Sequence, residues 1–361
     1  MRRAAWLQLA LVTGVALLVT SWAWWVFWHL TDDAFIVFRY VANRQAGWGY
    51  SWSPPPFQPV EGYTCFLWVV LLDLGSALTG RPPTELANPL ALVCSMGSLG
   101  LLAAATTMIW RRLGSALPLA LPLTVALAFT VSNRSFLAWT SSGLETALFD
   151  LLLHGWLLCV LLLAWRGQRW LWGLSAAAAL LALTRPEGSL YAASTVLLGL
   201  WFARRQRAPA LASLSPLVLV LVHLLWRRAT YGDWLPNTAY AKVAGVWPQS
   251  GLRYGALFVL EYALWLWALP VGYAIWRWWR SPHDRVADSH VIAVMTGLPV
   301  AAQLAGYLLV IGGDNFEFRC LAFTVPLLAL GLAWALLALR LRWPSFCGVS
   351  LVVLAAGAWL P

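Results

Sequence analysis

The sequence predicts an all-α protein with about eleven membrane-spanning helices. Of its 361 residues, 61% are hydrophobic and 11% are charged, and the mean hydropathy is +0.71. A soluble domain carries about 25% charged residues. Apolar stretches of roughly 17–25 residues, the length that crosses a bilayer as a helix, recur along the whole chain. The stretches predicted to span are 5–28, 86–110, 116–132, 144–165, 170–184, 186–203, 208–226, 255–276, 289–311, 319–339 and 344–360.

A further apolar stretch, 63–80, is predicted to stay at the membrane surface. It is short and carries Asp73 near its middle, where a charge is costly in hydrocarbon. If it crossed, Arg111 and Arg112 would fall outside, against the positive-inside rule. We therefore expect an interfacial or re-entrant helix near 63–80, a cytoplasmic N-terminus and an extracytoplasmic C-terminus.

This topology separates the charges of the chain. Of the predicted cytoplasmic residues, only Asp284 and Asp288 are acidic. The net charge of +10 therefore reflects membrane orientation and does not indicate nucleic-acid binding. The basic residues predicted to lie inside are Arg2, Arg3, Arg111, Arg112, Arg166, Arg169, Arg204, Arg205, Arg207, Arg277, Arg280, Arg285, Arg340 and Arg342.

The polar motifs gather on the predicted outer side. We expect one membrane-embedded domain, 1–361, with two larger outer loops at 29–62 and 227–254 and no C-terminal soluble domain. The cytoplasmic loops are short and basic. Carboxylates, guanidiniums and turn residues concentrated on one face are typical of an extracytoplasmic active site.

Asp32 and Asp33 follow the first apolar stretch and are the strongest catalytic candidates. Ionisable groups at the membrane edge are costly, so their presence favours a function. In a helix starting near Ala34, one carboxylate would face a cavity while the other caps the first turn, because adjacent helical residues point about 100° apart. The facing carboxylate could act as a general base towards a hydroxyl. The alternative is that both residues only end the first helix.

Three other segments each have a structural and a functional interpretation. The aromatic stretch 43–64 suits stacking on sugar faces and equally suits anchoring in lipid headgroups. Arg185 and Glu187 could form a local ion pair in a turn or line the outer cavity. Arg227 and Arg228 could bind lipid headgroups or a lipid-linked phosphate.

No metal site or required cofactor is predicted. The five Cys residues lie in or beside apolar stretches without metal-type spacing, and the five His residues are scattered. A divalent metal bridging carboxylate and phosphate remains compatible with the pattern, although no spacing demands one.

Taken in order, these motifs resemble the GT-C glycosyltransferases, and most closely the bacterial arabinofuranosyltransferase branch that uses decaprenyl-phosphoryl arabinofuranose. The resemblance spans about residues 5–330. The matching segments are Thr31-Asp32-Asp33-Ala34-Phe35, Arg39-Tyr40, Glu61-Gly62-Tyr63-Thr64, Phe66-Leu67-Trp68, Ser142-Gly143-Leu144-Glu145-Thr146, Leu183-Thr184-Arg185-Pro186-Glu187-Gly188, Tyr231-Gly232-Asp233-Trp234-Leu235-Pro236-Asn237-Thr238 with Lys242, and Gly312-Gly313-Asp314 with Arg319.

The resemblance implies a multi-pass enzyme of the bacterial plasma membrane that moves a sugar from a polyprenyl-phosphate carrier to an acceptor hydroxyl, with inversion. Glycan or lipid would be the acceptor. The first outer loop would supply the base, Asp33 or Asp32, with Asp33 favoured. Substrate-binding positions would be Arg39, Glu61, Tyr63, Glu145, Arg185, Glu187, Arg227, Arg228, Asn237, Lys242, Asp314 and Arg319.

Two other functions are carried as alternatives. A transporter or flippase of lipid-linked sugars usually has inverted repeats and polar groups at the membrane midplane, and neither is evident here. An inactive assembly partner with the same fold is the second alternative. Many relatives also carry an extracytoplasmic C-terminal domain, whereas this chain stops at Pro361.

Overall fold

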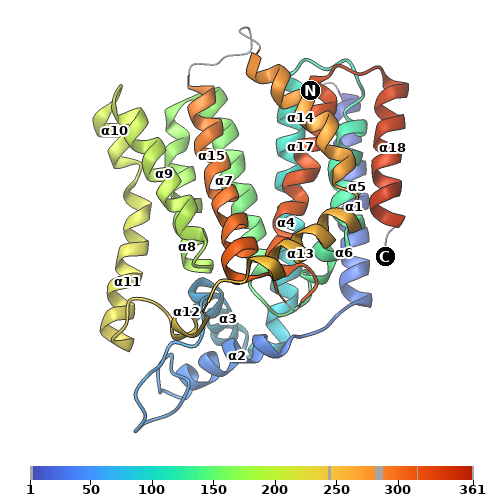
Figure 1. The fold of residues 1–361 in the computed structure, drawn as a ribbon. Helices are drawn as coiled ribbons and strands as arrows, with labels where there is room; N and C mark the ends of the chain where they lie inside the picture. Colours follow the sequence, from blue (N-terminus) through green and yellow to red (C-terminus); the bar gives the residue numbers. More distant parts are fainter. Residues whose placement is uncertain (1–2, 243–244, 281–287, 315, 360–361) are drawn as a thin grey trace.

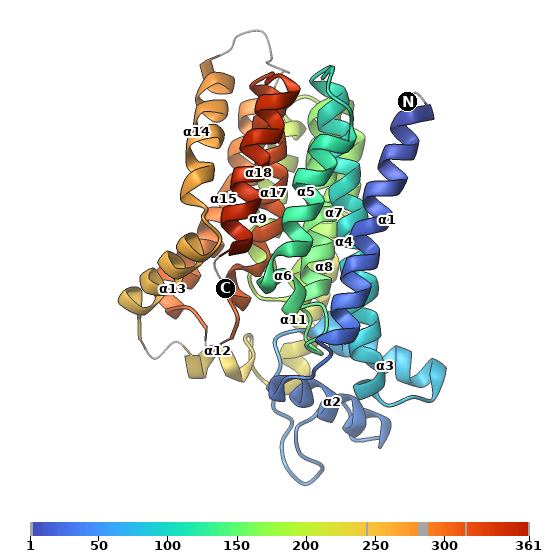
Figure 2. The same cartoon turned by 90° about the vertical axis from the view of Figure 1, so that its right-hand side faces the viewer.

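The computed structural model describes residues 3–242, 245–280, 288–314 and 316–359, and within them every regular element is a helix. Most of the long helices run side by side as a bundle (Figures 1 and 2). The elements are α1 (Arg3–Val26), α2 (Asp32–Gln45), α3 (Phe66–Thr79), α4 (Pro83–Arg112), α5 (Ala120–Ser132), α6 (Arg134–Ala138), α7 (Thr146–Arg166), η1 (Gln168–Trp170), α8 (Leu171–Thr184), α9 (Gly188–Ala203), α10 (Arg207–Ala212), η2 (Ser215–Leu217), α11 (Val218–Tyr231), α12 (Asn237–Lys242), α13 (Pro248–Glu261), α14 (Trp265–Arg280), α15 (Ser289–Ala305), η3 (Gly306–Ile311), α16 (Arg319–Ala322), α17 (Thr324–Ala338) and α18 (Trp343–Trp359).

The chain is a multi-pass membrane protein, but the predicted count of eleven spans is not confirmed. Among the described residues, six helical segments are long and apolar enough to cross a bilayer, and α13 with α14 makes a seventh if that bent pair counts as one span. The predicted span 255–276 is bent by 88° between Glu261 and Trp265, where Ala263 has a positive φ of 49°. The predicted span 116–132 is shorter in the structure, since α5 begins only at Ala120, after Pro118.

Helix α3 lies beside α2 at one end of the bundle (Figures 1 and 2), where the sequence predicted a surface helix. Its 14 residues give about 21 Å of helix, which is less than the ~30 Å of a hydrocarbon core. We call this end, which also holds α12, the α2 end. The second predicted outer loop, 227–254, contains α12 and the start of α13.

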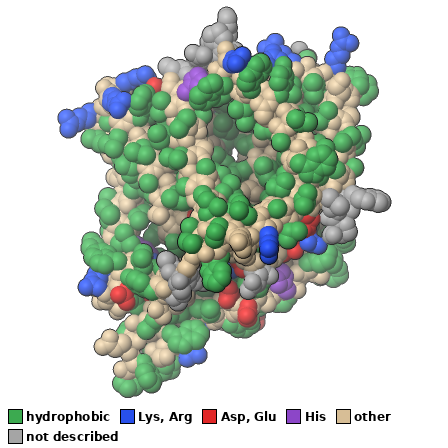
Figure 3. Space-filling view, in the orientation of Figure 1, with side chains coloured by type: hydrophobic (Ala, Val, Ile, Leu, Met, Phe, Trp, Pro, Cys, Tyr) green, Lys and Arg blue, Asp and Glu red, His purple; other side chains and the backbone are tan. Residues whose placement is uncertain are grey.

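The opposite end of the bundle is basic. Figure 3 shows a row of Lys and Arg side chains along that edge, where α4 ends at Arg112 and α14 ends at Arg280. The residues that the sequence assigned to the cytoplasm therefore share one end of the molecule. Arg2, Asp284 and Arg285 lie outside the described residues.

The amphipathic helix α2 is seated on α3, α4 and the start of α7. Tyr40 on α2 and Trp68 on α3 are completely buried within this hydrophobic cluster. Helix α2 begins at Asp32, two residues earlier than predicted, so both aspartates lie in its first turn. This packing fixes the position of the candidate base relative to the ends of the spanning helices.

Candidate functional site

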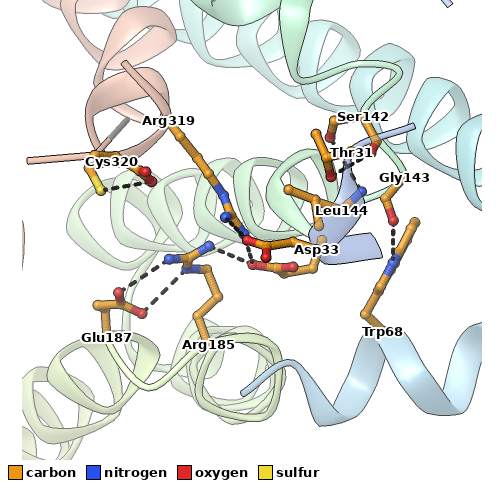
Figure 4. Close-up of polar contacts among 12 residues, drawn as sticks. Thr31, Asp33, Trp68, Ser142, Gly143, Leu144, Arg185, Glu187, Arg319 and Cys320 are labelled. Carbon is orange, nitrogen blue, oxygen red and sulfur yellow. Dashed lines mark hydrogen bonds and ion pairs between the residues drawn. The ribbon is translucent and has the colours of Figure 1, made fainter. Parts of the chain in front are cut away.

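Five charged side chains form a continuous chain of ion pairs at the α2 end (Figure 4). Asp33 Oδ2 lies 3.5 Å from Nη1 of Arg319, and Arg319 Nη2 lies 3.3 Å from Oε1 of Glu145. The same Glu145 oxygen is 2.5 Å from Nη1 of Arg185. Nη2 of Arg185 is in turn 3.4 Å from Oε1 of Glu187. We call these residues the ion-pair chain; it joins α2, α16, the start of α7 and the turn between α8 and α9.

The loop before α7 is fastened to the segments around it. The backbone amide and the hydroxyl of Thr31 both donate to the carbonyl of Ser142, at 3.0 and 3.2 Å. Trp68 Nε1 donates to the carbonyl of Gly143 at 3.1 Å. Gly143 has φ +77°, and a Cβ there would lie 2.7 Å from Leu30. Only glycine fits this turn, which sets the start of α7 against the start of α2.

A close turn between α8 and α9 holds the other end of the ion-pair chain. Arg185 ends α8 with an extended backbone, and Glu187 immediately precedes α9. A Cβ at Gly188 would lie 2.1 Å from the backbone carbonyl of Leu181. Glycine therefore allows the turn to fold back on α8, which directs the Arg185 and Glu187 side chains into the site.

Tyr307 completes this arrangement, although no sequence motif pointed to this residue. Its hydroxyl accepts from Arg185 Nη2 at 3.2 Å and donates to Glu187. Tyr307 lies in η3, a π-helical turn whose end is closed by Gly312 and Gly313, because both amides donate to the Tyr307 carbonyl at 3.0 and 3.1 Å. The positive φ angles of the two glycines permit this closure. Such π-helical turns are frequent at functional sites.

The carboxylates of Glu145 and Glu187 remain charged, although the first is buried and the second is only 20% exposed. Burial raises the pKa of Glu145, but the guanidiniums of Arg185 and Arg319 together hold it below its ordinary value. Burial likewise raises the pKa of Glu187. Arg185 and the Tyr307 hydroxyl outweigh this effect, so the pKa of Glu187 is lower than its ordinary value. The site therefore presents fixed charges of both signs at neutral pH.

A second, separate cluster surrounds the buried pair of Glu61 and Arg227. Glu61 Oε2 lies 2.6 Å from Arg227 Nε, and their side chains are 2% and 9% exposed. Burial raises the pKa of Glu61 despite the charge of Arg227. Asn237 donates its backbone amide to the Glu61 carbonyl at 2.9 Å. This pair ties the first predicted outer loop to the second and leaves Arg227 engaged with a carboxylate.

Other predicted substrate-binding residues lie around these clusters. The Tyr63 hydroxyl is 3.2 Å from the hydroxyl of Tyr231. Arg39 stacks over Trp52 with its Cζ 4.3 Å from the ring centre. Arg228 is exposed and lies 5.8 Å from the ring of Trp234. None of these three forms part of the ion-pair chain.

The remaining predicted residues have different surroundings. Asp32 is exposed and accepts from the backbone amide of Asp33 at 2.9 Å, so it occupies the first-turn position expected of one carboxylate. Asp314 Oδ2 lies 3.7 Å from Sγ of Cys320. The side chain of Lys242 lies outside the described residues.

Among the described residues, no group of three or more His, Cys, Asp or Glu side chains could hold a metal ion. The Glu145 oxygens face guanidiniums, and a cation there would compete with Arg185 and Arg319.

The chain matches no family model. It is 29% identical to a terminal β-(1→2)-arabinofuranosyltransferase of Mycobacterium tuberculosis, over 89% of this chain and 54% of the relative. It is 27% identical to the protein of the same name from Corynebacterium glutamicum, over 97% of this chain and 54% of the relative. The chain thus spans about half the length of these two relatives.

The fold is similar to that of ArnT from Cupriavidus metallidurans, in a structure bound to undecaprenyl phosphate. The TM-score is 0.61 at 15% sequence identity, covering 97% of this chain and 63% of ArnT. The resemblance to GT-C glycosyltransferases inferred from the motifs is confirmed, and the all-α membrane fold is of the GT-C type. The roles of individual residues stay predictions.

Proposed function

We propose that the chain is a membrane glycosyltransferase that moves a sugar from a polyprenyl-phosphate donor to an acceptor hydroxyl, with Asp33 as the general base. The observation that carries this proposal is the position of Arg319 between Asp33 and Glu145, at 3.5 and 3.3 Å. Such a transfer needs a base for the proton of the acceptor hydroxyl and a cation for the leaving phosphate, and this arrangement brings a candidate for each role to one site.

Asp33 has the exposure that a base needs. Its side chain is 46% exposed, so an acceptor hydroxyl can reach it. Its contact with Arg319 is long, which leaves the carboxylate oxygens available as proton acceptors. Asp32 instead accepts from the backbone amide of Asp33, and no ion pair involving it is seen among the described residues. These contacts favour Asp33 over Asp32.

Arg185 and Arg319 are suited to the phosphate of the donor. Arg319 is 14% exposed, and its buried Nε has no hydrogen-bond partner. An unpartnered buried donor of this kind is costly unless a ligand accepts from it. Glu145 holds both guanidiniums, so they are oriented before the donor arrives, and Arg forms the paired hydrogen bonds that phosphate favours.

The reaction follows from this placement. Asp33 takes the proton from the acceptor hydroxyl, and the oxygen forms a bond to the anomeric carbon of the donor sugar. The bond from that carbon to the phosphate oxygen breaks, and the polyprenyl phosphate leaves with the electron pair. Arg319 and Arg185 stabilise the charge that develops on the leaving phosphate. A single displacement of this kind inverts the anomeric configuration.

The sequence relatives and the basic end of the bundle support the identity of the donor and the side of the membrane on which the reaction takes place. Both sequence relatives are named for β-(1→2)-arabinofuranosyl transfer, and ArnT was solved with undecaprenyl phosphate. We therefore assign a polyprenyl-phosphate-linked arabinofuranose as the donor. The positive-inside rule favours a cytoplasmic location for the basic end, which puts the α2 end outside the plasma membrane.

The test uses the protein in proteoliposomes with a synthetic, labelled polyprenyl-phospho-arabinofuranose and an arabinofuranosyl oligosaccharide. Label should appear in the oligosaccharide. Asp33→Asn should lower the rate by about 10²–10⁴-fold, the range of general-base contributions, whereas the neighbouring Asp32→Asn serves as the matched control and should retain most activity. Movement of labelled donor between leaflets without product would instead support the transporter alternative. Full activity of both variants would refute the base assignment.

A further inference from the structure

A groove lies along α2 beyond the ion-pair chain. Its volume is about 460 Å³, which falls within the range of small-ligand sites, about 300–1,000 Å³. Its walls come from α2, the loop after α2 and the start of α12. We call it the aromatic groove; the residues used below are Ile36, Tyr40, Trp52, Phe57, Gln58 and Asn237.

The groove starts about one helical turn from the candidate base. Ile36 and Tyr40 follow Asp33 by three and seven positions on α2, so the three residues share one face of the helix. At 1.5 Å per residue, Ile36 lies about 4.5 Å and Tyr40 about 10.5 Å from Asp33 along the helix axis. A chain-like ligand in the groove can therefore present its end to Asp33.

The aromatic wall is built into the fold. Arg39 covers the Trp52 ring at 4.3 Å and donates from Nε to the Trp52 carbonyl at 2.7 Å. Asn43 Nδ2 donates to the same carbonyl at 3.1 Å. The Tyr40 hydroxyl donates to the Val60 carbonyl at 2.5 Å. The loop is thus held to α2 from several directions, although the Trp52 side chain itself remains 39% exposed.

The composition of the groove indicates its ligand. None of the described residues that line it carries a charge, and the nearby Arg39 guanidinium is stacked on the Trp52 ring. Trp52 and Phe57 offer apolar ring faces, while Gln58 and Asn237 offer amide groups. A neutral sugar has the complementary surface, because its C–H face is apolar and its hydroxyl edge forms hydrogen bonds.

The position of the loop disfavours a lipid. Figures 1 and 2 show the loop between α2 and α3 extending past the ends of the spanning helices, away from the bundle. Rings that anchored the protein in headgroups would lie level with the helix ends. The loop therefore lies beyond α2, on the side away from the bundle.

We propose that the aromatic groove binds the end of a neutral glycan, the acceptor of the transfer reaction. The assignment rests on the proposed function for its orientation towards Asp33, but the binding itself can be measured without any reaction. The terminal sugar would present its hydroxyl to Asp33, and the preceding sugars would lie against Trp52 and Phe57.

Binding is measured by calorimetry on the Asp33→Asn protein in nanodiscs, which tests the groove independently of the base. The probes are an arabinofuranosyl tetrasaccharide and an anionic hyaluronan tetrasaccharide. The neutral probe should bind, and Trp52→Ala and Phe57→Ala should each weaken it by roughly tenfold, equivalent to about 1.4 kcal/mol. Phe57 is 68% exposed, so its removal leaves the fold intact.

Trp172→Ala is the matched control. Trp172 is 50% exposed and lies at the start of α8, whose other end carries Arg185; its loss should leave the affinity unchanged. Unchanged affinity in both groove variants, tighter binding of the anionic probe, or no binding of the neutral probe would overturn the proposal.

Quenching of Trp52 fluorescence by brominated-lipid vesicles, measured as the difference between wild type and Trp52→Phe, would also overturn it. If the glycan binds as described and Asp33→Asn is nevertheless active in transfer, the groove stands and the base assignment fails.

Discussion

Arg185 and Arg319 share one carboxylate oxygen: Oε1 of Glu145 lies 2.5 Å from Nη1 of Arg185 and 3.3 Å from Nη2 of Arg319. Two guanidiniums this close repel each other unless an anion lies between them. Glu145 occupies that place as the N-cap residue of α7, where the helix dipole also favours a negative charge. The cation pair is therefore present before any phosphate binds.

Glu145→Gln should destabilise the protein and weaken donor binding together. The substitution keeps the shape but leaves two buried guanidiniums without their shared counter-ion, and breaking such a pair costs about 3–5 kcal/mol. We expect a lower thermal midpoint in detergent and a higher KM for the polyprenyl-phospho-sugar. Glu85→Gln, a first-turn carboxylate on α4 away from the site, is the control. Equal effects of the two changes would contradict the bridging role of Glu145.

The pH dependence of stability should have opposite signs at Glu187 and Glu61. Burial raises the pKa of Glu187 but Arg185 and Tyr307 bring it below 4.5. Its stabilisation is therefore complete above about pH 4.5 and is lost as the pH falls through the folded-state pKa. Burial raises the pKa of Glu61 above 4.5 despite Arg227, so its contribution is complete below that value and is lost as the pH rises through the raised pKa.

Thermal midpoints measured across pH 3–7, in about half-unit steps, test this difference. Glu187→Gln should reduce the loss of stability on acidification. Glu61→Gln should reduce the loss of stability as the pH rises above about 4.5. If both variants change the pH profile in the same direction, the opposite signs of the two pKa shifts are wrong.

Much of the candidate site could be predicted from the sequence as separate motifs, although their contacts could not. Asp33, Glu145, Arg185, Glu187 and Arg319 were each expected at the substrate cavity, and the structure brings all five together. Asp33 and Arg319 lie 286 positions apart, and no local pattern relates them. Their contact depends on how α16 and α2 meet.

The contacts of Tyr307 and Arg227 depend on tertiary structure for different reasons. In the sequence, Tyr307 lies within the predicted span 289–311, and nothing there distinguishes it from its apolar neighbours. Its π-helical turn depends on backbone hydrogen bonds from Gly312 and Gly313, which follow that span. The sequence predicts that Arg227 binds lipid headgroups or a lipid-linked phosphate; in the structure its side chain is buried and paired with Glu61. The sequence alone does not distinguish a charged residue that binds a ligand from one that pairs with another side chain.

Tyr307→Phe should weaken the positioning of Arg185 without removing any charge. The hydroxyl accepts from Arg185 and donates to Glu187, and loss of a hydrogen bond to a charged group costs about 1.5–3 kcal/mol. We expect a raised KM for the donor and a lower kcat, with the fold retained. Tyr273→Phe, at a side chain 54% exposed on α14, is the control and should change neither. A Tyr307→Phe enzyme with wild-type kinetics would remove Tyr307 from the site.

Comparing Gly143→Ala with Gly114→Ala should distinguish the backbone strain of a positive φ from a change in the geometry of the site. Gly143 has φ +77°, and a Cβ would lie 2.7 Å from Leu30 and 2.9 Å from Ala34. Gly114 has φ +59° with nothing within 4 Å of a Cβ, so Gly114→Ala introduces the φ strain alone, about 1–2 kcal/mol. Gly143→Ala should lose more stability than this control, since α2 must move away from the start of α7. Transfer activity should fall further still, because the same movement separates Asp33 from Arg319. Equal losses in the two variants, measured by thermal midpoint and by labelled-sugar transfer, would mean that the loop tolerates the added methyl group and does not set the distance between base and cation.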